Sequence, residues 1–113
     1  MKIDTRNKLK AVKTLNEYLN FLQNEFKSKD CKPGYLSKST LCYFIADLCK
    51  NNGVKIPNFE TIKNKAIDSN NIFDFIEIIK KELNADFNFS SNAKDELFIY
   101  TNKICLFINL QIK

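Results

Sequence analysis

The chain of 113 residues contains only two glycines and two prolines, and this scarcity of turn formers constrains its fold more than any other feature. The four residues fall in two places, Lys32–Gly34 and Asn52–Pro57, and divide the chain into three blocks. Within each block, apolar residues recur at spacings of three and four, which is typical of amphipathic helices. We therefore predict a single domain over residues 1–113 that folds as an all-α, compact bundle of about five helices.

The first two predicted helices follow directly from these repeats. A long first helix is expected from about residue 5 to residue 27, with Asp4 or Thr5 as its N-cap. The second helix is expected to open at residues 37–40 and to stop at residues 51–53. Gly53 can close it because glycine readily takes the left-handed conformation.

Three further helices are predicted in the last block. They cover residues 59–67, 72–84 and 92–108. The expected N-cap is Asn58 for the first of these helices, Asn71 for the second, and Ser91 or Asn92 for the third. The helix over residues 72–84 carries apolar residues on more than one face, so we expect it to be central, with neighbours on two sides. Residues 106–112 alternate at period two, which leaves an extended final segment open as an alternative.

The chain has no histidine, which removes the commonest general base and the commonest metal ligand. Glycine-rich phosphate loops, nucleophile elbows and metal-binding helix motifs are also missing. The four cysteines, Cys31, Cys42, Cys49 and Cys105, form no CxxC pair, and Cys42 and Cys49 share one apolar helix face as buried free thiols. We therefore expect no enzyme activity, no cofactor and no bound metal.

Excess positive charge is confined to the first third of the chain. Residues 1–38 hold nine Lys and Arg against four Asp and Glu, whereas residues 39–113 hold nine of each. On the first predicted helix, Arg6, Lys10 and Lys13 lie opposite the apolar stripe. Tyr18 and Phe21 border these basic residues, and Phe21 is either covered by another helix or an aromatic anchor for a partner. These five residues form the first candidate binding site.

A second candidate surface is acidic. Asp74, Glu77 and Glu82 lie on the helix predicted over residues 72–84. Their carboxylates offer an alternative contact face for a partner that carries a basic patch.

Localisation is predicted from two absences in the sequence. The N-terminal residues show no secretory pattern, because a strongly basic stretch is followed by an amphipathic one. The longest apolar run, Ile104–Ile108, is too short to cross a bilayer. We therefore expect a cytoplasmic protein that does not span a membrane.

The small size, the composition rich in Asn, Lys, Ile and Phe, and the lack of enzymatic motifs point to one class of protein. In these features the whole chain resembles the small cytosolic immunity proteins of bacterial toxin systems, including those of contact-dependent growth inhibition and of bacteriocins. The resemblance implies a protein-binding module that neutralises a cognate toxin domain by occluding its active or binding surface. The basic charge of the chain favours an acidic partner over a nuclease, which needs a basic surface of its own.

Two other functions compete with this interpretation. A small basic nucleic-acid-binding regulator of bacterial or phage origin would place Arg6, Lys10 and Lys13 on phosphates, although a single arginine limits the reading of bases. A peripheral membrane protein would use the same basic helix, but the apolar face of that helix is the predicted core face. We expect a protein partner, with nucleic acid as the alternative.

Overall fold

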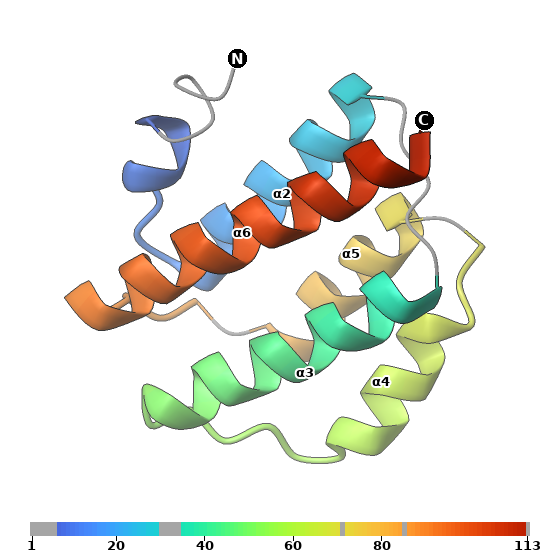
Figure 1. The fold of residues 1–113 in the computed structure, drawn as a ribbon. Coiled ribbons are helices and arrows are strands. Elements are labelled where there is room, and N and C mark those ends of the chain that lie inside the picture. Colours follow the sequence, from blue (N-terminus) through green and yellow to red (C-terminus); the bar gives the residue numbers. More distant parts are fainter. Residues whose placement is uncertain (1–6, 30–34, 71, 85, 113) are drawn as a thin grey trace.

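The computed structural model describes the backbone of residues 7–29, 35–70, 72–84 and 86–112 and the side chains of residues 7–27, 38–70, 72–84 and 86–104. These residues form five helices and, at residues 7–10, one further helical turn (Figure 1). The helices are α2 (Leu15–Lys29), α3 (Tyr35–Asn51), α4 (Phe59–Ile67), α5 (Ile72–Leu83) and α6 (Ser91–Ile112). The only β pairing in this part of the chain is an isolated bridge between Thr14 and Asn88. The predicted all-α fold is confirmed.

The first predicted helix is wrong in one respect, because the chain leaves the helical path between residues 10 and 15. Thr14 and Glu17 form a capping box that starts α2. The Thr14 hydroxyl oxygen accepts a hydrogen bond from the backbone N–H of Glu17 at 3.2 Å, and a Glu17 carboxylate oxygen accepts from the backbone N–H of Thr14 at 3.0 Å. In the non-helical segment before α2, the backbone carbonyl of Lys13 accepts a hydrogen bond from the N–H of Phe89 at 2.9 Å. The predicted caps Asp4 and Thr5 lie outside the described residues.

The end of α3 agrees with the prediction. Gly53 has φ 76°, in the left-handed region. Its N–H donates to the carbonyl of Lys50 at 3.1 Å, and the N–H of Val54 donates to the carbonyl of Cys49 at 2.8 Å. This pair of bonds is the Schellman motif, which satisfies carbonyls that the end of the helix would leave unpaired.

The predicted caps of the later helices are partly correct. Asn58 is the N-cap of α4, as predicted. Its backbone is left-handed, with φ 58°, and its side chain makes no capping hydrogen bond. The cap of α6 is Ser90, not Ser91 or Asn92, since the Ser90 hydroxyl accepts from the N–H of Ala93 at 3.1 Å. The predicted cap of α5, Asn71, lies outside the described residues.

The final segment of the chain is helical. Helix α6 runs without a break for 22 residues to Ile112, so the alternative of a strand over residues 106–112 is wrong. The period-two pattern there fits equally well onto a helix in which apolar residues occupy several faces. No helix in the described ranges is both long enough and apolar enough to cross a membrane.

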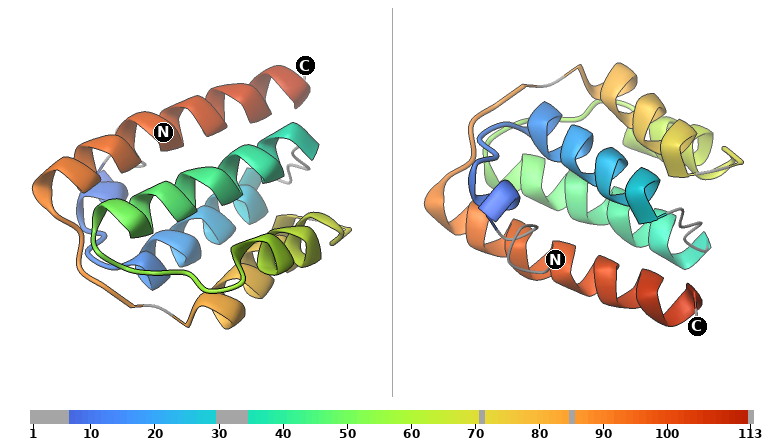
Figure 2. Two further views of the ribbon diagram at one scale, coloured as in Figure 1. Left: turned by 90° about the horizontal axis from the view of Figure 1, so that it is seen from below. Right: turned by 90° about the horizontal axis from the view of Figure 1, so that it is seen from above.

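The helices are arranged in three layers (Figure 2). Helix α6 forms one outer layer, α2 and α3 lie side by side in the middle, and α4 and α5 form the other outer layer. Packing contacts join α3 to both α4 and α6, and α5 to both α2 and α4. Helix α5 therefore has neighbours on two sides, as predicted, but it lies in an outer layer and the central position belongs to α2 and α3.

One hydrophobic core extends through the layers. Phe75 of α5, Leu22 of α2 and Leu97 of α6 are each almost completely buried in it. Cys42 and Cys49 lie in the same core as free thiols, which confirms the prediction for this pair.

Candidate functional site

Lys10 and Lys13, two of the three predicted basic residues, do not share one continuous helix. Lys10 is exposed on the helical turn at residues 7–10, where it borders a hollow of about 270 Å³ together with Lys94 and Asp95 of α6. Lys13 is also exposed, but it lies in the break before α2, and its backbone N–H donates to the Glu17 carboxylate at 2.8 Å. Arg6 lies outside the described residues. The helix break therefore separates Lys10 from Lys13.

The two aromatic residues assigned to that stripe are core residues. Tyr18 is 0% exposed and Phe21 is 8% exposed. The Tyr18 hydroxyl oxygen accepts a hydrogen bond from the Thr101 hydroxyl of α6 at 3.1 Å. Because α2 lies in the middle layer, it is covered on more than one face, and residues beside its apolar stripe are buried as well. The burial of Phe21 agrees with the alternative in which another element of the fold covers it, and neither Phe21 nor Tyr18 is exposed to a partner.

The three predicted acidic residues are exposed on α5. A Glu77 carboxylate oxygen accepts from the Gln23 amide of α2 at 3.1 Å and lies 3.4 Å from the Lys80 ammonium. Both neighbours lower the pKa of Glu77. Glu82 forms an ion pair at 3.1 Å with Lys65 of α4.

These acidic contacts connect α5 to its neighbours. Exposed pairs of this kind contribute at most about 1 kcal/mol each, because water and salt screen them. Asp74 lies in the first turn of α5, where a carboxylate is favoured by the helix dipole. The acidic residues are thus accounted for by contacts and helix chemistry within the bundle.

An exposed tyrosine on α3 marks a different surface, which the sequence reasoning missed. Tyr43 is 47% exposed. Its ring centroid lies 5.7 Å from that of Phe59, the first residue of α4. The Lys63 ammonium lies 5.2 Å from the centre of the Tyr43 ring and donates a hydrogen bond to its hydroxyl at 3.2 Å. Phe59 and Lys63 thus hold the tyrosine ring in place at the surface.

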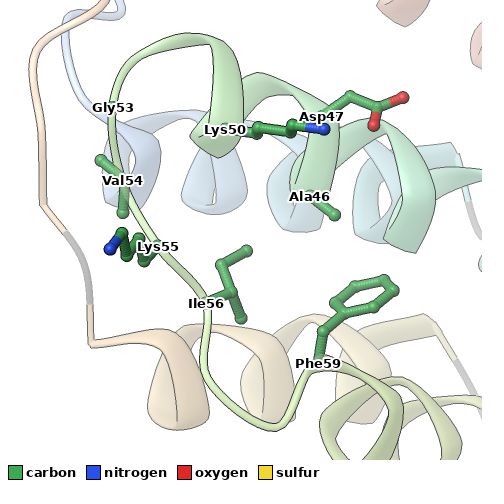
Figure 3. A pocket seen from close by; sticks show the side chains of 8 residues that line it. All are labelled: Ala46, Asp47, Lys50, Gly53, Val54, Lys55, Ile56 and Phe59. Carbon is green, nitrogen blue, oxygen red and sulfur yellow. The ribbon is translucent and has the colours of Figure 1, made fainter.

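A hollow of about 540 Å³ lies between α3 and the loop that leads into α4 (Figure 3), and Phe59, which packs against Tyr43, is one of the residues that line it. It is lined by Ala46, Asp47, Lys50, Gly53, Val54, Lys55, Ile56 and Phe59. Figure 3 shows the side chains of Ile56 and Phe59 directed into the hollow, with Ala46 of α3 facing them. We call Tyr43, Phe59, Lys63 and this hollow the Tyr43 surface.

The local sequence explains why the hollow exists. The Schellman turn at Gly53 ends α3 and sends the chain away from the helix axis, so that the following loop runs beside α3 without packing tightly on it. Ala46 has a small side chain and leaves space where a larger residue would fill it. Val54 and Ile56 are half-buried, which places an apolar floor within reach of solvent.

Charged side chains surround this apolar floor. Lys50 and Asp47 project from α3, and Lys55 projects from the loop. All three are exposed, and none of them forms an ion pair with another residue in the described part of the chain. Lys63 differs from these residues, because its ammonium lies 3.2 Å from the Glu60 carboxylate. Tyr43 and Glu60 raise the pKa of the Lys63 ammonium and keep it charged.

One sequence signal could have identified the Tyr43 surface. Tyr43, Asp47 and Lys50 are spaced by four and three residues, so they lie on one face of α3. That face carries charges, and an aromatic residue on a charged helix face is a candidate contact residue. Phe59 gives no such signal, because its proximity to Tyr43 depends on the path of the loop.

The described side chains include no group of three or more His, Cys, Asp and Glu residues that could hold a metal ion. The Tyr43 surface offers an apolar hollow, a fixed aromatic ring and charged groups, which are the elements of a binding site. Comparison with known proteins finds no matching family model, no matching curated protein and no matching solved structure.

Proposed function

We propose that this protein is a binding module that neutralises a partner protein by occluding part of its surface, without catalysing a reaction. The observation that carries the proposal is the half-exposed ring of Tyr43, which packs against Phe59, a residue that lines an apolar hollow. Tyrosine is enriched at protein interfaces because its ring buries a large apolar area while its hydroxyl remains hydrogen-bonded.

The fixed geometry of Tyr43 favours tight binding. A side chain that is mobile in the free protein loses conformational entropy on binding, at about 0.5–1.5 kcal/mol for each immobilised side chain. Phe59 and Lys63 already hold the Tyr43 ring, so less of this entropy remains to be lost. A rigid helical face suits occlusion, because it can cover the partner's surface while the backbone of this protein changes little on binding.

The most specific form of the proposal is immunity against a bacterial toxin. Size, composition and lack of enzymatic motifs support it through the resemblance to cytosolic immunity proteins. In this proposal the protein acts in the bacterial cytoplasm and binds a toxin domain before it reaches its target. The Tyr43 surface makes the contact, in place of the basic and acidic surfaces inferred from the sequence.

Growth rescue tests this function. The product of the adjacent upstream reading frame is expressed in a host with the wild-type chain, with Tyr43→Ser or with Ile99→Ser. Ile99 is the matched control, because it is 56% exposed and lies on another helix, α6, which forms an outer layer of its own. We expect wild type and Ile99→Ser to restore growth and Tyr43→Ser to fail. A Tyr43→Ser protein that restores growth fully would exclude the Tyr43 surface as the contact.

Nucleic-acid binding stays as the second candidate, because Lys8, Lys10 and Lys13 are all exposed within six residues. Binding to phosphates through these lysines predicts an affinity that falls steeply as salt rises. The test is a titration of labelled single-stranded DNA at low and at physiological salt. Salt-dependent binding that the triple Lys→Gln variant loses, together with failed growth rescue by the wild type, would favour this candidate over immunity.

A further inference from the structure

We propose that the hollow of the Tyr43 surface binds an acidic segment of the partner, which inserts an apolar side chain over Ile56 and Phe59 and places carboxylates beside Lys50 and Lys55. The inference rests on the proposed function and specifies the chemistry of the partner. It is drawn from the shape of the hollow, from its apolar floor and from the distribution of charge around it.

The volume and lining of the hollow suit a peptide side chain. At about 540 Å³ and open to solvent, it has room for an apolar side chain. Its floor consists of the half-buried side chains of Val54, Ile56 and Phe59. An apolar side chain seated there would remove these groups from water, at about 25 cal/mol for each Å² of apolar surface buried.

The charges at the edge of the hollow select an acidic segment. Lys50 projects from α3 and Lys55 from the loop, so the two ammonium groups come from different elements that both line the hollow. Within the described residues neither lysine has an ion-pair partner, whereas Lys63 and Lys65 are already paired with Glu60 and Glu82. A segment that carries carboxylates therefore finds two available cations.

The remaining charged group gives the segment an orientation. Asp47 is the one carboxylate among the residues that line the hollow, and it lies one helical turn from Lys50 on α3. Its oxygens can accept hydrogen bonds from backbone or side-chain donors of the bound segment. A basic segment would meet Lys50 and Lys55 together, and like charges at such distances disfavour binding.

Peptide titration followed by nuclear magnetic resonance tests the inference. The probe is a synthetic hexapeptide with Leu-Phe at its centre and two glutamates on each side. Two matched peptides carry lysines in place of the glutamates, or serines in place of Leu-Phe. We expect the acidic apolar peptide to shift the amide signals of Ala46, Lys50 and residues 53–56 saturably, and both matched peptides to bind at least tenfold more weakly.

Matched variants separate specific contacts from overall charge. Lys50→Gln/Lys55→Gln should weaken binding of the acidic peptide at least tenfold. Lys81→Gln/Lys103→Gln removes the same charge from exposed positions elsewhere and should change binding less than twofold. Both pairs replace exposed side chains, so both proteins should fold like the wild type, which circular dichroism checks.

Several results would overturn the inference. Equal binding of the acidic and basic peptides, or shifts centred on Lys8–Lys13, would show that the hollow does not select an acidic segment. Stronger shifts at the hollow from a single-stranded oligonucleotide would assign the site to phosphates. Growth rescue separates this inference from the proposed function. Rescue by wild type and by Lys50→Gln/Lys55→Gln, but not by Tyr43→Ser, would retain the function and reject the acidic segment.

Discussion

The hydrogen bond between Thr101 and Tyr18 gives the sharpest stability prediction, because both residues are 0% exposed and it joins α6 to α2. Thr101→Val replaces the donating hydroxyl by a methyl group of similar size. Loss of one partner of a buried hydrogen bond costs about 1–3 kcal/mol. The added methyl returns about 0.8 kcal/mol of apolar burial. We therefore expect the free energy of unfolding to fall by up to about 2 kcal/mol.

Urea unfolding followed by far-ultraviolet circular dichroism measures this loss, since the five long elements of the described residues are all helices. In a thermal scan the same change should lower Tm by about 4 °C for each kcal/mol in a domain near this size. Thr101→Ser serves as the control, because it keeps the hydroxyl and removes only the methyl group.

A double-mutant cycle with Tyr18→Phe isolates the energy of the pair from the other contacts of each side chain. We expect a coupling energy of about 1 kcal/mol. A coupling near zero, with Thr101→Val as stable as the wild type, would refute the reasoning that this bond holds α6 on the bundle.

Three further predictions concern the capping box, the end of α3 and the buried thiols. The hydrogen bonds from the backbone N–H groups of Lys13 and Thr14 lower the pKa of Glu17, so the stability that its carboxylate contributes is present above pH 4.5 and is lost as pH falls through the lowered pKa. The difference in urea midpoint between wild type and Glu17→Gln should therefore shrink on acidification, and an unchanged difference would contradict the capping role. Gly53→Ala should destabilise the protein by about 1 kcal/mol, because φ 76° is unfavourable for alanine although no atom lies within 4 Å of the added Cβ. Gly53→Asn should lose less stability. Equal losses of stability in urea unfolding would argue against the backbone explanation. Burial raises the pKa of Cys42 to about 12 and that of Cys49 to about 11. Peptide mapping should therefore find both thiols unmodified by a thiol reagent at neutral pH and fully modified in urea. Rapid labelling of the native protein would mean that this part of the core opens easily.

Local signals in the sequence were sufficient to predict most helices. Apolar residues at spacings of three and four, together with Gly53, located α3 and its end. The break before α2 was missed because Leu9, Val12 and Leu15 continue the helical spacing across it, and all three are buried as that spacing predicts. The spacing reports which residues face the core, and it does not reveal whether the backbone stays helical between them.

The errors at the candidate site arise from tertiary structure. Phe21 falls beside the polar face of its own helix, and only the middle-layer position of α2 explains its burial. The hollow depends on the path of the loop after Gly53, which brings Ile56 and Phe59 opposite Ala46. No spacing along one helix encodes this arrangement. The sequence could therefore identify Tyr43 as a surface residue, but not the hollow beside it.

The Thr101–Tyr18 bond joins residues that are 83 positions apart, and this separation has a consequence for synthesis on the ribosome. At about 5–20 residues per second, the ribosome takes about 4–17 s to pass from Tyr18 to Thr101. For most of that interval α2 has been synthesised, but α6, whose Thr101 donates the hydrogen bond to the buried tyrosine, has not. The nascent chain therefore exposes one face of its middle layer until late in translation. We expect this intermediate to be the species most prone to aggregation and the natural substrate for chaperones that bind nascent chains.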